Sequence, residues 1–239
     1  MKKFLIALLF APMLAFASGG NVHLDKWPGS VGDKAALQNG AKLFVNYCLN
    51  CHGASYMRYK NLLDLGLTEQ QVKDNLMFTS DKIGGLMAVA ARADEQKQWF
   101  GATPPDLTII ARARGDAGAP KAGADWLYTY LRSFYRDEKR PTGWNNVVFE
   151  NVGMPHILYG LQGQQVLNHE THKLELAVPG SMAPAEFDKA VSDLVGFMVW
   201  MGEPQQEFRQ NLGFLVLAFL AVLFVVAYAL KKEYWKDIH

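Results

Sequence analysis

The 239-residue chain contains only two cysteines, Cys48 and Cys51, and both lie in one short motif. No cysteine is left for a disulfide elsewhere, so we expect packing around that motif to hold the fold together. A second pair of cysteine or histidine ligands at a suitable spacing is also missing, which argues against a four-ligand zinc site. The sequence has no basic stripe, and this argues against a nucleic-acid partner.

The two cysteines are three residues apart and are followed at once by His52. The pattern Cys-x-x-Cys-His is typical of c-type haem attachment, in which two thiols form thioethers and the histidine offers its imidazole to the iron. A redox Cys-x-x-Cys motif would follow a strand and begin a helix, whereas here the segment before Cys48 is predicted to be helical. We therefore predict one haem c, bound covalently through Cys48 and Cys51, with His52 as an iron ligand.

The N-terminal segment, residues 1–17, has the three parts of a secretory signal peptide. Two lysines are followed by an apolar run, and Ala15-Phe16-Ala17 provides the small residues of a cleavage site. A retained membrane anchor is the alternative, although the run is short for a span of roughly 20 residues. We expect cleavage after Ala17 and export of residues 18–210, a haem domain in the periplasm.

The C-terminal region predicts one transmembrane helix over residues 211–230. The stretch from Leu212 to Leu230 carries no charge, and at about 1.5 Å per residue it covers a hydrocarbon core of roughly 30 Å. A core helix of a soluble protein would need a polar face. Lysines follow the span closely, so the positive-inside rule places the tail, residues 231–239, in the cytoplasm.

Residues 18–210 are enough for one domain, with 19 Lys and Arg against 21 Asp and Glu, a formal balance of −2. A mildly acidic exported surface suits a basic protein partner, although charged faces are usually only solvated. The charge balance is therefore compatible with a basic partner and does not by itself identify one.

Two long helices are predicted from apolar residues at three- and four-residue spacing. The first begins near Asp33, a good N-cap, and carries the stripe Leu37, Ala41, Phe44, Cys48 and Cys51. Gly40 in this helix has two interpretations: it allows another helix to approach closely, or, as is more common for a lone Gly in a helix, it only weakens the helix. The second runs from Pro184 to Gly202 with the stripe Phe187, Val191, Leu194, Val195 and Met198. We expect the two helices to cross beside the haem.

Shorter helices are predicted over residues 68–77, with Thr68 as the cap, and over residues 126–134. Strand patterns are scarce, and the alternation after residue 173 predicts one small hairpin. Residues 139–163 are rich in Pro, Gly and Asn and show no period. The expected fold is mainly α: a c-type cytochrome domain with long irregular insertions and one small β-hairpin, plus a C-terminal transmembrane helix.

Long irregular segments inside compact domains tend to be functional, and this one contains Met154 between Gly153 and Pro155. A thioether in the sixth coordination position would favour Fe(II) and raise the reduction potential. The flanking Gly and Pro favour a fixed loop that presses a sulfur toward the iron. The alternative ligands are Met77, Met87 and Met182, and the histidines His156, His169 and His172, which we expect to be ordinary surface residues.

Several blocks of the sequence together resemble bacterial cytochrome c1, the haem c subunit of the cytochrome bc1 complex. They are residues 37–44 before the cysteines, residues 99–107 with Pro-Pro-Asp-Leu, residues 111–115 with Ala-Arg-Ala-Arg, and residues 153–155, followed by the single anchor. The resemblance covers nearly the whole mature chain. The second and third blocks are more specific than the haem-attachment pentapeptide, which occurs in many carriers.

The resemblance implies particular roles in haem binding. It implies that His52 and Met154 are the axial ligands, that Arg114 meets a haem propionate, and that Pro104 and Pro105 pack along the haem edge. A buried propionate needs a bidentate donor that stays charged, which suits arginine. The alternative for Arg114 is a solvent-facing side chain.

Trp126 and the missing cysteine pair also bear on this resemblance. Trp126 stands where the family has an aromatic residue near the haem, although core packing would also explain it. The missing cysteine pair implies that a structural disulfide of the family is absent, so the loop from Gly115 to Gly123 must be held otherwise.

The resemblance implies one-electron transfer in a respiratory quinol–cytochrome c oxidoreductase of the bacterial inner membrane. The chain would take an electron from the Rieske iron–sulfur protein, beside cytochrome b, and give it to a soluble or membrane-anchored c-type cytochrome. It would not be an enzyme on its own. The first alternative is another membrane-anchored monohaem carrier, a subunit of an oxidase or dehydrogenase. The second is a haem-based gas sensor or peroxidase with an open iron position.

Overall fold

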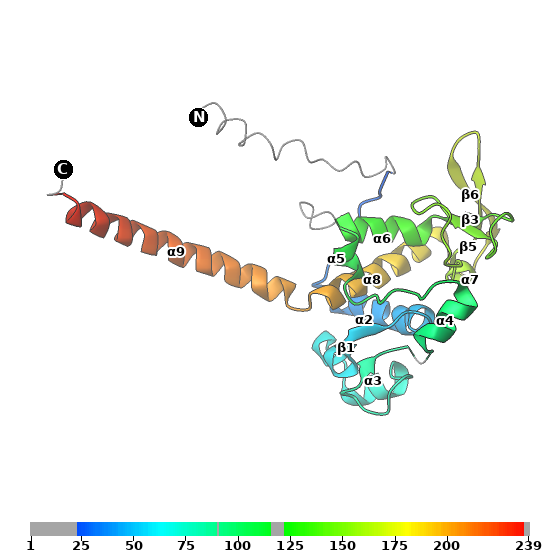
Figure 1. Cartoon of the computed structure of the whole chain (residues 1–239), viewed down its shortest axis with the longest axis horizontal. Helices are drawn as coiled ribbons and strands as arrows, with labels where there is room; N and C mark the ends of the chain where they lie inside the picture. Colours follow the sequence, from blue (N-terminus) through cyan, green and yellow to red (C-terminus); the bar gives the residue numbers. More distant parts are fainter. Residues whose placement is uncertain (1–22, 90, 116–121, 237–239) are drawn as a thin grey trace.

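The computed structural model describes residues 23–89, 91–115 and 122–236. The predicted signal peptide, residues 1–17, lies outside the described residues, as do residues 116–121 of the Gly115–Gly123 loop and the last three residues. Figure 1 shows a compact body made of short and medium-length helices, from which the long helix α9 extends away.

The helix that leads to the haem-attachment motif is α2 (Lys34–Leu43). The predicted cap is confirmed, because the Asp33 side chain accepts a hydrogen bond from the Ala36 backbone nitrogen at 3.1 Å. The chain continues as a π-helical turn, η2 (Phe44–Cys48), which ends at the first cysteine. A helix therefore precedes the motif, as predicted, but it ends at Cys48, and Cys51, which was expected on the same helix, lies in the following turn.

The second long helix, α8 (Pro184–Gly202), has the predicted bounds and packs along α2 (Figure 1). Gly40 lies against the backbone carbonyl of Asp193, where any side chain on residue 40 would collide with it. The Phe44 and Phe197 rings pack with centroids 5.5 Å apart. Of the two interpretations of Gly40, the structure shows the close approach, and these two helices form the centre of the core.

Shorter elements surround this helix pair. They are η3 (Tyr59–Leu65), α3 (Glu69–Asn75), α4 (Ala93–Phe100), α5 (Ile110–Ala113), α6 (Ala122–Arg132) and α7 (Tyr159–Gln162). The predicted Thr68 cap is confirmed as a capping box with Gln71. The helix predicted over residues 126–134 ends earlier, because Phe134 leaves the helix and pairs with Asn146 as a strand residue.

Three two-stranded antiparallel sheets are present among the described residues, whereas one was predicted. They pair β1 (Ala54–Arg58) with β2 (Leu86–Met87), β3 (Phe134–Arg136) with β4 (Trp144–Asn146), and β5 (Gly163–Asn168) with β6 (Lys173–Pro179). The predicted hairpin is β5–β6. β2, β3 and β4 have only two or three residues, too few to show an alternating pattern, and the five residues of β1 do not alternate between buried and exposed.

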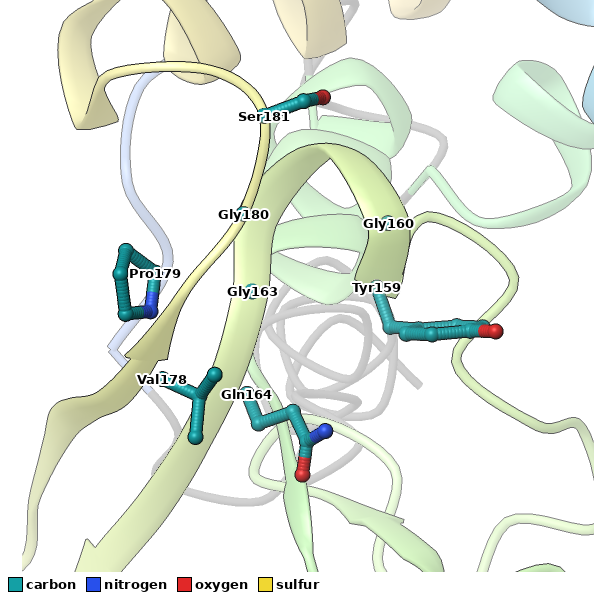
Figure 2. A pocket seen from close by; sticks show the side chains of 8 residues that line it. All are labelled: Tyr159, Gly160, Gly163, Gln164, Val178, Pro179, Gly180 and Ser181. Atoms are coloured by element: carbon teal, nitrogen blue, oxygen red, sulfur yellow. The ribbon is translucent and has the colours of Figure 1, made fainter.

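A shallow hollow of about 410 Å³ lies at the base of this hairpin, between α7 and the strands. Figure 2 shows Gly163 and Gly180 on neighbouring segments, where the two backbones approach closely. Gly163 has a φ of 99°, which a residue with a side chain rarely adopts. The lining contains no carboxylate, imidazole, thiol or thioether, so the hollow has the features of a tight backbone crossing and not of a chemical site.

The C-terminal helix α9 (Gln206–Tyr234) contains the predicted span. Its mean hydropathy is 2.8 over the most apolar window, and none of that window is buried against the rest of the chain. The exposed side chains on the surface of this helix are mainly its own phenylalanines, leucines and valines. Such a surface is stable in lipid and not in water, so α9 fits a single-pass membrane anchor.

Candidate functional site

All eight residues that the sequence nominated lie around one cleft of about 390 Å³. They are Cys48, Cys51, His52, Pro104, Pro105, Arg114, Trp126 and Met154. The rest of the lining is mostly apolar and includes Phe100, Ile110, Leu127, Leu131, Phe149 and Met198. The size and the few polar groups are typical of a cofactor site.

One wall of the cleft is formed by the cysteine–histidine motif at the end of η2. A tight turn follows Cys48, whose carbonyl accepts hydrogen bonds from the Cys51 and His52 backbone nitrogens at 3.1 and 2.8 Å. The buried Gln96 side chain of α4 donates to the Cys51 carbonyl at 2.9 Å. Burial raises the pKa of the Cys48 thiol to about 12, the opposite of what a redox-active cysteine needs.

The imidazole of His52 is oriented by the Pro-Pro-Asp-Leu segment. Its Nδ1 lies 2.8 Å from the Pro105 carbonyl oxygen, which can only accept a hydrogen bond, so Nδ1 carries the proton. That tautomer leaves the lone pair of Nε2 available for a metal. Burial lowers the pKa of His52, against the opposing effects of the Pro105 carbonyl and Asp106, and so favours the neutral ring that a ligand requires.

The Pro-Pro-Asp-Leu segment is in turn fixed to the turn after the motif. The Leu107 backbone nitrogen donates to the Gly53 carbonyl at 2.8 Å, and the Asp106 carboxylate accepts from the Ser55 backbone nitrogen at 2.7 Å and from the Thr108 hydroxyl at 2.6 Å. Partial burial acts to raise the pKa of Asp106, but these hydrogen bonds outweigh it and lower that pKa. Pro105 thus has a positioning role through its carbonyl, beyond the packing that the resemblance implied.

Met154 also lines the cleft and is half-buried. Its sulfur accepts a hydrogen bond from the Tyr130 hydroxyl, with the two atoms 3.4 Å apart. The alternatives Met77, Met87 and Met182 do not line the cleft, whereas Met198 of α8, which the sequence indicated as core, does. Among the thioethers of the described residues, Met154 and Met198 are therefore the ones that reach this cleft.

The histidines named as alternative ligands lie elsewhere. His169 and His172 are exposed at the turn of the β5–β6 hairpin. His156 was expected at the surface, and that prediction is wrong: its side chain is buried and stacks on the Phe134 ring at 4.9 Å. Burial lowers the pKa of His156 to about 4, so this ring is neutral and part of the core.

The loop that carries Met154 is held by side chains that the sequence analysis missed. The buried Asn146 side chain accepts from the Val148 and Phe149 backbone nitrogens and donates to the Tyr130 carbonyl at 2.8 Å. Arg140 donates to the side chain and carbonyl of Asn151, at 3.1 and 2.9 Å. The left-handed turn of the loop is at Asn151, with a φ of 62°, and not at Gly153.

Arg114, Trp126 and Tyr130 form a stacked column beside the cleft. The Arg114 guanidinium carbon lies 4.5 Å from the centroid of Trp126, and the Trp126 and Tyr130 rings are stacked with centroids 4.7 Å apart. Arg114 is exposed and makes no ion pair with another described residue. The guanidinium is thus held over an aromatic face while its N–H donors remain available to an anion.

These groups fit a covalently bound haem. Two thiols, a neutral imidazole and a thioether line one cleft, the rest of the lining is mostly apolar, and Arg114, which has no ion pair among the described residues, lines it as well. Neither thiol is in a disulfide. Together with α9, this donor set defines a membrane-anchored c-type cytochrome.

Comparison with known proteins agrees with that class. The model of the cytochrome C1 family matches residues 26–84 and 79–238. A cytochrome c1 of Allochromatium vinosum is 44% identical over 252 residues, which cover the whole of both chains. The cytochrome c1 of Rhodospirillum rubrum is 29% identical and covers 94% of this chain and 92% of its own length.

A protein of Nitrosomonas europaea named ammonia monooxygenase gamma subunit is 49% identical, over the whole of this chain and 99% of its own length. The family match and the cytochrome c1 relatives show that the chain belongs to the cytochrome c1 family. It is accordingly an electron-transfer protein of the cytochrome bc1 complex with one covalent haem c.

Proposed function

We propose that the haem is attached through Cys48 and Cys51 and that His52 and Met154 are its two axial ligands. The observation that carries this proposal is the fixed orientation of His52 by Pro105, on a cleft that a hydrogen-bonded Met154 also lines. When bound, the haem supplies a one-electron Fe(III)/Fe(II) couple. An imidazole and a thioether together leave no iron position open, which argues against a gas sensor or peroxidase.

The other nominated residues would hold and shield the cofactor. Arg114 would donate to a propionate, because its planar guanidinium suits a carboxylate and has no competing ion pair among the described residues. Trp126 would keep that guanidinium in place through their stacked contact. Pro104 and Pro105 would cover one edge of the cofactor, and Pro105 would also keep the His52 ring in its ligating tautomer.

The partners would be those of a quinol-oxidising complex. We infer that cytochrome b lies beside α9 in the membrane, that the Rieske iron–sulfur protein is the electron donor, and that a c-type cytochrome, soluble or membrane-anchored, is the acceptor. The formal balance of −2 over residues 18–210 favours a basic acceptor and long-range steering. Electron transfer to a basic cytochrome c should then slow as the ionic strength rises above about 0.1 M.

The topology would be that of an exported haem domain on an anchor. Residues 1–17 would be removed, residues 18–210 would lie in the periplasm, and residues 231–239 would remain in the cytoplasm. Lysines directly after the span support this orientation. Truncation after Gln210 should release a soluble haem protein with a nearly native spectrum, because the apolar window of α9 buries nothing against the domain.

Gentle detergent extraction of the intact chain, followed by identification of its co-purifying subunits, tests the whole assignment. Recovery with a Rieske protein and a multi-span cytochrome b is the expected result. Recovery with an oxidase, a dehydrogenase or monooxygenase subunits would contradict it, the last in line with the name of the Nitrosomonas relative. Carbon monoxide binding by the reduced, unmodified protein would contradict the closed coordination.

A further inference from the structure

The Tyr130 hydroxyl has one hydrogen-bond partner among the described residues, the sulfur of Met154, at 3.4 Å. The sulfur of a thioether can only accept, so the hydroxyl is the donor. Tyr130 is 8% exposed, so its hydroxyl has little access to water. A phenylalanine would fill the same space without burying a polar atom, and burial of a hydroxyl is unfavourable unless it is paired. The hydrogen bond to the Met154 sulfur therefore explains why this position has a tyrosine, whereas packing alone does not.

The ring that carries this hydroxyl is held on several sides. Trp126 stacks on it with centroids 4.7 Å apart and planes 13° apart, and Phe134 meets it edge-on at 5.1 Å. The Tyr130 backbone carbonyl accepts a hydrogen bond from Asn146, the same side chain that organises the start of the Met154 loop. The donor is therefore rigid, and its position is coupled to the position of the loop that it contacts.

We propose that Tyr130 is a positioning residue that orients the Met154 sulfur and tunes its strength as an electron donor. This inference rests on the proposed function, in which Met154 is an axial ligand. A hydrogen bond from Tyr130 occupies one lone pair of the sulfur and leaves the other for the metal. It also draws electron density from the sulfur, which weakens its donation and disfavours the more positive oxidised state. Tyr130 thereby raises the reduction potential above the value that a thioether alone would give.

The test is Tyr130→Phe in the full-length, membrane-extracted protein, because this change removes only the hydroxyl oxygen and keeps the stacked ring. A redox titration should show a lower potential, seen as an oxidised-to-reduced ratio raised about two- to fivefold at a fixed ambient potential, as expected for one weak hydrogen bond to sulfur. The absorption band of the oxidised protein that reports the bond between the haem iron and the Met154 sulfur should shift or weaken. Covalent haem content should stay unchanged.

Tyr128→Phe is the matched control. Tyr128 lies on the same helix, is also buried, and has its ring 4.2 Å from the Arg132 guanidinium carbon, but it does not line the cleft. Its hydroxyl makes no hydrogen bond with another described residue, and it is not one of the fully buried unpaired polar atoms, so water can reach it. Tyr128→Phe should change neither the reduction potential of the haem nor the absorption band that reports the bond between the haem iron and the Met154 sulfur. A Tyr130→Phe protein that matches this control in both measurements would overturn the proposal, and so would one that fails to incorporate haem, because the hydroxyl would then serve folding.

A double variant separates this proposal from the ligation on which it rests. In a Met154→Leu background there is no sulfur to accept the hydrogen bond, so Tyr130→Phe should have no further effect on the potential. An equal effect in both backgrounds would mean that the hydroxyl acts as a general dipole, and would overturn the role. If Met154→Leu leaves the reduction potential unchanged, the proposed ligation by Met154 is wrong. If Met154→Leu lowers the potential but Tyr130→Phe does not, the ligation stands and the positioning role of Tyr130 is wrong.

Discussion

The two sides of the haem cleft are built in different ways. On the attachment side Cys48, Cys51 and His52 lie within five residues of one another, at the end of one helical segment, and Pro105, 53 residues away in the chain, orients the imidazole. On the Met154 side a single sulfur is positioned by other segments, with hydrogen bonds from the Tyr130 hydroxyl to the sulfur and from Arg140 to the loop. The first side is therefore specified by a short sequence pattern, and the second exists only after the chain has folded.

This difference predicts how each side fails. Loss of the attachment side should remove the cofactor around which the domain packs. Loss of the Met154 side should leave the cofactor attached and change its potential, its reactivity or the stability of one loop. Four variants, taken in order of decreasing effect, test this contrast.

The largest effect is expected when Cys48 and Cys51 are both changed to Ser. The haem loses both of its covalent tethers, and the apolar cleft loses the group that fills it, so little stable protein should accumulate in the membrane. Immunoblotting and haem staining of membranes measure both quantities. Normal amounts of folded apoprotein would mean that the domain does not depend on its haem.

Met154→Leu should have the next largest effect, and it should be one of function. The haem stays attached, but without the thioether the potential should fall by on the order of 0.1 V or more, and the reduced protein should bind carbon monoxide. Redox titration and carbon monoxide difference spectra are the measurements. An unchanged potential would assign the sixth position to another side chain, with Met198 as the first candidate because it lines the same cleft.

Asn146→Ala should destabilise the loop that carries Met154 while leaving Met154 itself unchanged. The side chain is fully buried and makes hydrogen bonds with the Tyr130 carbonyl and with two backbone nitrogens of the following loop, so we expect a loss of about 2–4 kcal/mol in the free energy of unfolding. Denaturant unfolding of the detergent-solubilised protein measures it. The exposed Asn75→Ala, at the end of α3, is the control and should change stability by less than about 0.5 kcal/mol.

Asp106→Asn should have the smallest effect and should depend on pH. The hydrogen bonds to its carboxylate lower the pKa of Asp106 in the folded state, so its contribution to stability is present above the ordinary carboxyl pKa of about 3.9 and is lost as the pH falls through the lower folded value. The variant should be less stable than the wild type by about 1 kcal/mol at pH 7.

The difference between Asp106→Asn and the wild type should shrink below about pH 4, where the wild-type carboxylate also becomes protonated. Thermal unfolding at pH 7, 5 and 3 measures this trend. Asp64→Asn, an exposed position on η3, is the control. A difference that stays constant with pH would mean that the charge of Asp106 does not support the His52 loop.

Sequence patterns were sufficient for the elements whose signals are local. The Asp33 cap, the Thr68 cap and both ends of α8 were predicted because capping and helix termination depend on residues within one turn. The strands β3 and β4 were not predicted, since a three-residue strand has no measurable period. Phe134 was assigned to a helix because its spacing fits one, although its pairing with Asn146 prevails.

The site shows the same division. The composition and spacing of Cys48, Cys51 and His52 were sufficient to predict a covalent haem c, because thioether formation and ligation require those residue types at that separation. The sequence alone also determined the anchor, since lipid requires about 20 uncharged residues in a row. Both are requirements that a linear pattern can satisfy.

Only the tertiary structure decided which thioethers face the cleft, that His156 is buried, and that the Tyr130 hydroxyl meets the Met154 sulfur. Tyr130 and Met154 are 24 residues apart, and the geometry between them depends on α6, on β3–β4 and on the Asn146 hydrogen bonds at once. Contacts of this kind are set by the packing of several elements and leave no periodic signal in the sequence. For that reason the attachment of the haem was predictable from five residues, whereas the environment of the Met154 sulfur was not.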